Sequence, residues 1–338
     1  MKTLLYLSLT LAACRLFAQP ANPGWTHLPP DAAAIYDFNL KALTAKIPWY
    51  ALAAPIPAPQ RHTANRTLVS ILRHPDNAGV DVRHDLFIIV QTDTCKTTSF
   101  LLELVDTARW SAFLKTQSPD QRLAVAYNHR FAVLTYLNVQ PDQGHPVELR
   151  RLALRRSQSI LKGYDSSSCI REPLFRSGFS DGADIRAWTR HGQLVHALST
   201  IRFERGRILL TSIIDLPPGA DSPYTGLLGQ LLTQLRTHGR SLRDSIRWIG
   251  QLLDTFPPSL DSMLVLTPRT PTAPLSGYLD CKALSAYYKD LPLLSAMDKL
   301  TFSAGRLNTS GQIENTFELT LLDPRAYSLQ TLWPLLGP

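Results

Sequence analysis

The sequence is poor in cysteine and in charge, and each shortage excludes a class of protein. Four cysteines in 338 residues are too few for a small domain held together by disulfide bonds. Only 18% of the residues are charged while 44% are hydrophobic, which excludes disorder for most of the chain. The sequence has no glycine period and no enrichment in alanine, glutamate and lysine, so collagen and coiled coil are also excluded. The length allows about two domains of ordinary size.

The sequence also lacks the motifs of several known chemistries. It has no His-Glu-x-x-His, phosphate loop or Gly-x-Gly-x-x-Gly, so we expect no metal and no cofactor. His191 and His196 are five residues apart, which misses the spacing of two ligands on one helix face. Ser180 lies in a Gly-x-Ser-x-Gly pattern, but a strand candidate follows where this motif needs a helix. Ser159–Lys162 matches Ser-x-x-Lys without the partner motifs of acylating enzymes. We therefore expect no catalytic residue.

The first residues are typical of an export signal. Lys2 precedes an apolar run over residues 4–13, too short to span a bilayer as a permanent helix, and no later stretch approaches 18 apolar residues. The run leads into Leu-Ala-Ala-Cys, the pattern at which bacterial lipoproteins are cut and lipidated, here on Cys14. The alternative cut follows Ala18 and leaves a chain that starts at Gln19. Both predict an extracytoplasmic protein, either periplasmic or held at the outer membrane by lipid.

The mature chain is basic. Removal of residues 1–18 takes away Lys2 and Arg15 and lowers the net charge from +8 to +6. The helix predicted over Glu148–Lys162 has one apolar and one basic face, typical of a solvated outer surface. Its basic side chains are also candidates for contact with anionic lipid or lipopolysaccharide phosphate, and they are Arg150, Arg151, Arg155 and Lys162. Nucleic acid is not expected as a partner of an exported chain without basic and aromatic clusters.

Proline and turn residues divide the chain into segments. Residues 1–18, or 1–13 in a lipoprotein, form the signal, and residues 19–32, with four prolines, are predicted as a tether. Strand pairs and helices then alternate over residues 33–163 and again over residues 175–338. This pattern predicts an α+β fold of two modules, each an antiparallel or mixed sheet with packed helices.

A short sequence pattern occurs in both predicted modules. Asn39–Ala45 reads Asn-Leu-Lys-Ala-Leu-Thr-Ala, and Asp280–Ala286 reads Asp-Cys-Lys-Ala-Leu-Ser-Ala. Each follows an apolar strand candidate and begins with a residue that favours the cap of a helix. The repeat predicts that the modules are related. Asp106 is expected to cap another helix, and the last helix is expected to open at Asp323-Pro324.

The pairing of the cysteines and the role of several aromatic residues stay open at this stage. Cys95, Cys169 and Cys281 remain after either cut, and this odd number allows at most one internal disulfide. Their wide spacing gives no zinc pattern. Several aromatic residues near the repeated helices are core if they are buried and could stack on sugars if they are exposed. They are Trp25, Trp49, Tyr50, Tyr287 and Tyr288.

The order of these elements resembles an uncharacterised family of secreted proteins and lipoproteins, a domain of unknown function abundant in Bacteroidota. The resemblance covers roughly residues 28–338 and implies an envelope location, without any established activity or catalytic residue. The matching segments are Asp31–Leu43, Gly79–Asp85, Leu101–Lys115, Asp184–Trp188 and Ser328–Leu332.

These observations predict a non-enzymatic cell-envelope protein that acts by binding a protein partner or an envelope glycan. Two alternatives remain at this stage. The first is an envelope hydrolase that uses Ser180 or carboxylates that meet only in space. The second is a structural or adhesin module.

Overall fold

The computed structural model describes most of the chain in segments. They are residues 23–53, 66–92, 96–117, 123–137, 146–164, 174–175, 182–191, 195–215, 264–266, 275–286, 292–307 and 312–332. They form a large antiparallel sheet with helices packed against it, so the predicted α+β class is confirmed.

The first half of the chain contributes five strands and most of the helices. The strands are β1 (Ala34–Phe38), β2 (Leu86–Gln91), β3 (Thr97–Glu103), β4 (Leu123–Tyr127) and β5 (Phe131–Leu137). The helices are η1 (Pro23–His27), α2 (Leu40–Lys46), α3 (Trp49–Ala53), α4 (Arg66–Arg73), α5 (Pro75–Ala78), α6 (Thr107–Thr116) and α7 (Pro146–Lys162).

The second half contributes longer strands and shorter helices. The strands are β6 (Ile185–His191), β7 (Val195–Glu204), β8 (Arg207–Asp215), β9 (Leu264–Leu266), β10 (Leu275–Asp280), β11 (Met297–Leu307) and β12 (Ile313–Leu321). The helices are α12 (Cys281–Ser285), α13 (Pro292–Ser295) and α14 (Ser328–Leu332). Residues 224–235 and 242–253, whose apolar spacing predicts two amphipathic helices, lie outside the described residues.

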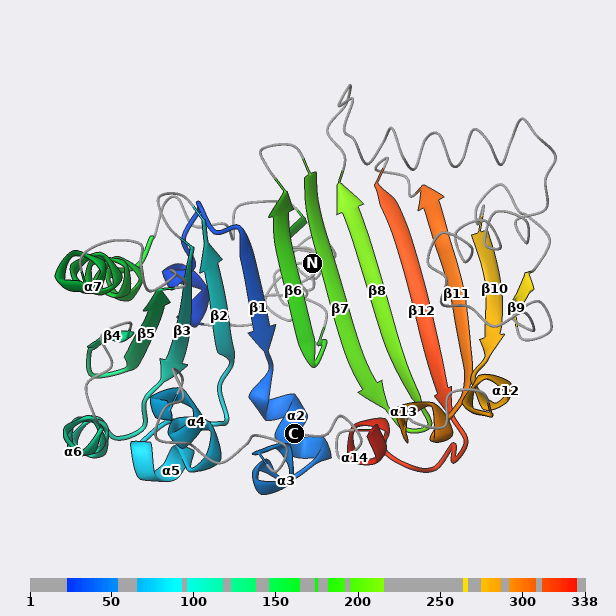
Figure 1. Ribbon diagram of the computed structural model, residues 1–338, viewed down its shortest axis with the longest axis horizontal. Coiled ribbons are helices and arrows are strands. Elements are labelled where there is room, and N and C mark those ends of the chain that lie inside the picture. Colours follow the sequence, from blue (N-terminus) through cyan, green and yellow to red (C-terminus); the bar gives the residue numbers. More distant parts are fainter. Residues whose placement is uncertain are drawn as a thin grey trace, which may run out of the picture.

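All described strands belong to one continuous sheet. Its order is β4-β5-β3-β2-β1-β6-β7-β8-β12-β11-β10-β9, and every neighbouring pair is antiparallel. Strand β1 pairs with β2 on one side and with β6 on the other, so the sheet continues across the predicted boundary between modules. We call this β1–β6 junction the seam. Most helices gather at one end of the sheet, while α7 lies beside β4 and β5 (Figure 1).

Alternation along the strands buries both faces of the first half. Leu102 faces a cluster built with helices α2 to α6, whereas its neighbour Leu101 faces a second cluster that includes Ile160 of α7 and Leu28. Successive side chains of a strand point to opposite faces, which explains why strands covered on both sides are almost continuously apolar. The seven side chains of β5 are all buried.

In the middle of the second half, one row of side chains across the sheet is apolar and the adjacent row, on the opposite face, is polar. Leu210, Phe317 and Phe302 are direct partners across β8, β12 and β11, and so share one face. Thr211, Thr316 and Ser303 are direct partners on the opposite face. A small cluster of Cys281, Met297, Leu321 and Leu332 packs where α12 to α14 meet the sheet.

The predicted helix caps are confirmed. Asn39 Oδ1 accepts a hydrogen bond from the N–H of Ala42 at 2.9 Å, and Asp280 Oδ1 accepts one from Ala283 at 2.8 Å. The repeated pattern therefore forms the same local unit twice, a strand followed by a side-chain-capped helix. Asp106 caps α6 by accepting from the N–H groups of Ala108 and Arg109. Such caps stabilise a helix by about 1 kcal/mol.

Two predicted boundaries are wrong. Residues 23–32, expected within the tether, form η1 and then enter the core, where Leu28 and Ala32 are fully buried. Prolines limit the helical part of this segment to one short turn, but its apolar side chains still pack in the core beside the sheet. The last helix begins at Ser328, because Asp323 instead closes a turn by accepting from the N–H of Arg325.

Candidate functional site

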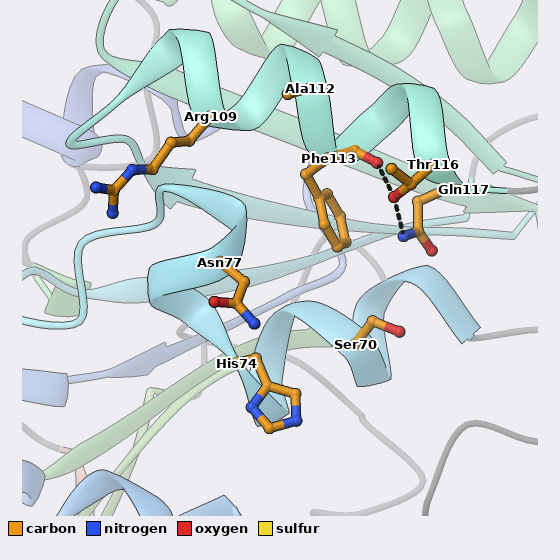
Figure 2. A pocket seen from close by; sticks show the side chains of 8 residues that line it. All are labelled: Ser70, His74, Asn77, Arg109, Ala112, Phe113, Thr116 and Gln117. Carbon is orange, nitrogen blue, oxygen red and sulfur yellow. Dashed lines mark hydrogen bonds between the residues drawn. The ribbon is translucent and has the colours of Figure 1, made fainter.

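A pocket of ≈ 490 Å³ lies between helices α4, α5 and α6, on the outside of the first half of the sheet (Figure 2). Eight residues line it. They are Ser70, His74, Asn77, Arg109, Ala112, Phe113, Thr116 and Gln117. Apart from the Phe113 ring and Ala112, all of them carry polar or charged side chains.

Close backbone packing holds the walls of the pocket together. Gly79 ends α5 with φ +68°, and its carbonyl accepts hydrogen bonds from the N–H groups of Val105 and Asp106 at the start of α6. A Cβ at Gly79 would lie 2.4 Å from the carbonyl oxygen of Asp106. Glycine therefore allows both the turn and the close approach. On the inner side of α6, the fully buried Trp110 anchors the helix to the core.

The Phe113 ring gives the pocket its apolar surface. It packs partly against Trp110, with ring centroids 6.0 Å apart, and points into the space between the helices (Figure 2). Asn77 points into the same space from α5. Gln117 Nε2 donates to Thr116 Oγ1 at 3.2 Å, and Thr116 in turn donates to the carbonyl of Phe113 at 2.7 Å. The Gln117 amide is thus held beside the ring.

The described lining residues are rich in hydrogen-bond donors and include no carboxylate. Amides and hydroxyls both donate and accept, whereas a guanidinium only donates. Arg109 is exposed and lies 3.3 Å from Asp106, measured from Nε to Oδ2. In the described part of the chain, no hydrogen bond joins the His74 ring to the Ser70 hydroxyl. The described lining therefore places hydrogen-bond donors and acceptors around one aromatic ring.

Two carboxyl groups do meet in space, but not in a cleft. Asp37 of β1 lies beside Asp85 and Arg186, and its side chain is fully buried. A glycosidase pair must reach a sugar from both sides, and the fully buried Asp37 cannot. The carboxylates that the sequence left open for a hydrolase are therefore not placed for that reaction at this position.

The basic residues predicted as an anionic contact lie on one helix. Arg150, Arg151, Arg155 and Lys162 are all exposed on α7. The inner face of α7 holds Ala153 and Ile160 in the core, and Ser157 donates to Thr135 of β5 at 2.8 Å. The helix is therefore docked on the sheet with its basic side in solvent, as the sequence predicts.

Some of the other predicted residues lie within the described segments of the chain, and others lie outside them. Cys14, Ser180, Cys95 and Cys169 lie outside the described residues. Cys281 is a buried free thiol, and burial together with Asp280 raises its pKa. Among the aromatic residues, Trp49 donates its ring N–H to the carbonyl of Leu72 in the core, whereas the Tyr50 ring is 78% exposed. Tyr287 and Tyr288 lie outside the described residues.

Sequence reasoning missed the pocket and the buried charges. Arg109, Ala112 and Phe113 lie in the segment Leu101–Lys115 that resembles the Bacteroidota family, but no chemical motif contains the pocket residues, since they converge from α4 and α5 on one side and from the distant α6 on the other. The sequence does indicate the buried charge, because Asp37 is the only acidic residue in the apolar strand Ala34–Phe38. An acidic residue in such a strand is seldom buried without a partner, and here the partner is Arg186.

The described residues contain neither a metal-binding cluster nor a membrane-spanning helix. No group of three or more His, Cys, Asp or Glu side chains is placed to hold a metal ion within the described segments. None of the described helices is long and apolar enough to cross a membrane.

The comparisons with known proteins give little. No family model matches the sequence, and no curated protein matches it. Two solved structures, crystal forms III and I of TP0453, are similar at 10% identity, with TM-scores of 0.33 and 0.34. They cover 62% and 64% of this chain and 86% and 88% of their own. Superpositions this loose do not show a shared fold. The resemblance to the Bacteroidota family stays a prediction.

Proposed function

We propose that this chain is a non-enzymatic cell-envelope protein that binds a glycan in the pocket between α4, α5 and α6. The observation that carries the proposal is the lining of that pocket. An aromatic ring offers its face to the C–H side of a sugar, and the amide and hydroxyl side chains around it offer paired donors and acceptors to sugar hydroxyls. The envelope location rests on the signal at the N-terminus, with Cys14 as the proposed site of lipidation.

The absence of carboxylates among the described lining residues favours binding over hydrolysis. Glycoside hydrolysis needs two carboxyl groups on either side of the bond that is cleaved. The described lining residues include none, whereas Asn77 of α5 and Gln117, directly after α6, both line the pocket together with Phe113. Amides in these positions orient a sugar without moving protons.

We also propose the finer architecture of two related modules joined in one sheet. Both the order of the elements and the helix caps support this proposal. Strand β1 with α2 is followed by the hairpin β2–β3 and by α6, and β10 with α12 is followed by the hairpin β11–β12 and by α14. Both units begin with a side-chain cap at the same place.

The test is binding of purified mature protein to an array of envelope glycans, followed by calorimetry with the best ligand. Asn77→Ala together with Gln117→Ala removes two hydrogen-bonding groups, each contributing about 0.5–1.5 kcal/mol. We expect the dissociation constant to rise about tenfold. Lys115→Ala, on α6 but outside the lining, is the matched control and leaves affinity unchanged.

The same experiment can contradict the proposal. Binding that is insensitive to the double variant places the glycan elsewhere. If no glycan binds and a defined envelope protein binds instead, the partner is a protein and the glycan proposal is wrong. Circular dichroism of both variants confirms that the helices around the pocket are intact.

A further inference from the structure

Helix α7 turns a face that is both basic and apolar toward solvent. At 3.6 residues per turn, Arg151, Arg155 and Lys162 lie within about 40° of one another around the helix axis. Val147 and Leu154 lie beside this row and are 52% and 38% exposed. We call these side chains, with one more arginine at the edge of the row, the α7 face. Its members are Val147, Arg150, Arg151, Leu154, Arg155 and Lys162.

The composition of the α7 face suits an anionic phospholipid surface. Its four cationic side chains are exposed, and Glu148 is the only acid in the sequence of the helix. Guanidinium groups donate paired hydrogen bonds to phosphate oxygens. Exposed aliphatic side chains such as Leu154 and Val147 can enter the headgroup region between them. The face therefore offers a phospholipid leaflet both charge and a small apolar contact.

The N-terminal segment enters the fold directly beside the C-terminal end of α7. The N–H of Tyr164 donates to the carbonyl of Thr26 at 2.7 Å, and the ring nitrogen Nδ1 of His27 lies 2.8 Å from the carbonyl oxygen of Ile160. Eight residues separate Cys14 from η1, and a chain of this length spans at most about 30 Å. Helix α7 is itself about 25 Å long. A lipid on Cys14 is therefore confined to the neighbourhood of the α7 face.

The sheet separates the α7 face from the pocket. Helix α7 packs on one face of the sheet through Ile160, in the cluster that contains Leu101. Trp110 of α6 packs on the other face, in the cluster that contains Leu102. Leu101 and Leu102 are successive residues of β3, and successive side chains of a strand point to opposite faces. A chain that rests on α7 thus holds the pocket on the far side of the sheet.

We propose that the α7 face lies on the anionic phospholipid leaflet that holds the lipid of Cys14, so that the chain is attached at two points and the sheet keeps the pocket away from the bilayer. This inference rests on the proposed envelope location and lipidation, and it is independent of what the pocket binds. Each contact of a basic side chain with an anionic membrane surface is weak. The anchor compensates for that, because it holds the α7 face at an effective concentration on the order of millimolar.

An acidic protein is the other kind of partner that a basic surface attracts. The entry point of the N-terminal segment favours the leaflet, because an anchored chain brings the α7 face to the membrane whether or not another protein is present. The exposed Leu154 adds to this preference, since an apolar side chain among arginines is typical of helices that lie at a membrane surface.

The test attaches the chain from Arg15 onward, through its N-terminus, to a diacyl lipid in vesicles of phosphatidylethanolamine and phosphatidylglycerol. Hydroxyl-radical oxidation followed by mass spectrometry reports which side chains the membrane covers. We expect the oxidation rate of Leu154 to be about threefold lower than on vesicles in which phosphatidylcholine replaces phosphatidylglycerol, because headgroups cover this side chain. Tyr50 on α3, 78% exposed, and Leu322, 47% exposed, are internal controls and keep their rates.

Arg151→Glu together with Arg155→Glu reverses the charge at the centre of the α7 face. Repulsion from phosphatidylglycerol is expected to return the oxidation rate of Leu154 to its value on phosphatidylcholine. Lys282→Glu together with Arg325→Glu makes the same change in net charge at two exposed positions in the second half of the chain. This matched control keeps the protection of Leu154. Urea midpoints of both variants verify that the fold is intact.

Three outcomes overturn the contact. The first is equal oxidation of Leu154 on the two kinds of vesicle. The second is protection of Tyr50 in its place, because another face then meets the membrane. The third is protection of Leu154 that appears only when an acidic envelope protein is added, since that protein is then the occupant.

The anchor is tested separately, by the mass of the mature chain isolated from cells. A diacylglyceryl group on Cys14 supports attachment at two points. A chain that starts at Gln19 overturns it and leaves the glycan proposal for the pocket untouched.

Discussion

Single residues decide how the helices of this protein meet its sheet. Asn39, Asp106 and Asp280 cap three helices with their side chains, and Gly79 lets the end of α5 touch the start of α6. The caps are local, and so they can be read from the sequence. The role of Gly79 depends on a neighbour almost thirty residues away, and no local pattern reveals it.

Gly79→Ala is expected to destabilise the protein and to open the pocket. The new Cβ would meet the Asp106 carbonyl at 2.4 Å, at a φ of +68° that L side chains rarely adopt. We expect a loss of about 2–3 kcal/mol in the free energy of unfolding, measured by urea denaturation.

Gly182→Ala is the matched control that separates the contact between the new Cβ and the Asp106 carbonyl from the strain of a positive φ. Gly182 also has a positive φ, of +42°, but a Cβ there meets nothing within 4 Å. Its loss is expected to be about 1 kcal/mol. Equal losses at the two positions would mean that the contact with Asp106 contributes nothing.

Among the elements, α7 combines a structural and an exposed face. Its 17 residues dock on β4 and β5 through Ala153, Ser157 and Ile160, while the basic residues face solvent. The sequence predicts this division, because the period of an α-helix separates the two kinds of residue. What the exposed face contacts stays a prediction.

Arg151→Gln together with Arg155→Gln is expected to weaken binding to vesicles that contain phosphatidylglycerol. Each basic side chain near such a surface contributes about 1 kcal/mol, so the partition coefficient should fall about tenfold or more in a sedimentation assay. Both residues are exposed, and the stability of the fold should not change.

The control for that experiment removes the same charge elsewhere. Arg83→Gln with Arg325→Gln changes two exposed arginines that lie outside α7. If this control weakens vesicle binding as much as the α7 variant, the effect comes from net charge alone, and α7 is not the contact.

On the scale of the whole molecule, the continuous sheet sets the cooperativity of folding. Every strand from β4 to β9 is bonded to its neighbours, and the seam lies inside the sheet rather than between two domains. A continuous sheet couples the stabilities of its two halves, because β1 and β6 each lose a partner when either half unfolds.

We therefore expect both halves to unfold in one transition at pH 6. Hydrogen exchange followed by mass spectrometry in increasing urea should show amides of β2 and β3 losing protection together with those of β11 and β12. Two separate transitions at this pH would instead describe modules that fold independently.

The sequence alone determined the class, the caps and much of the order of elements. Alternating apolar strands, a two-faced helix and residues such as Asp106 act within a few positions, so their structural meaning is local. It also predicted the exposed basic face of α7. It failed at residues 23–32, because their proline content suggested a tether while Leu28 and Ala32 found places in the core.

Only the tertiary structure decided the pocket and the seam. Asn77, Phe113 and Gln117 come together because α5 is packed on α6 through Gly79, a contact between segments far apart in the chain. Asp37 meets Arg186, 149 residues later, because β1 pairs with β6. Sequence identifies the acid, whereas the packed sheet supplies its partner.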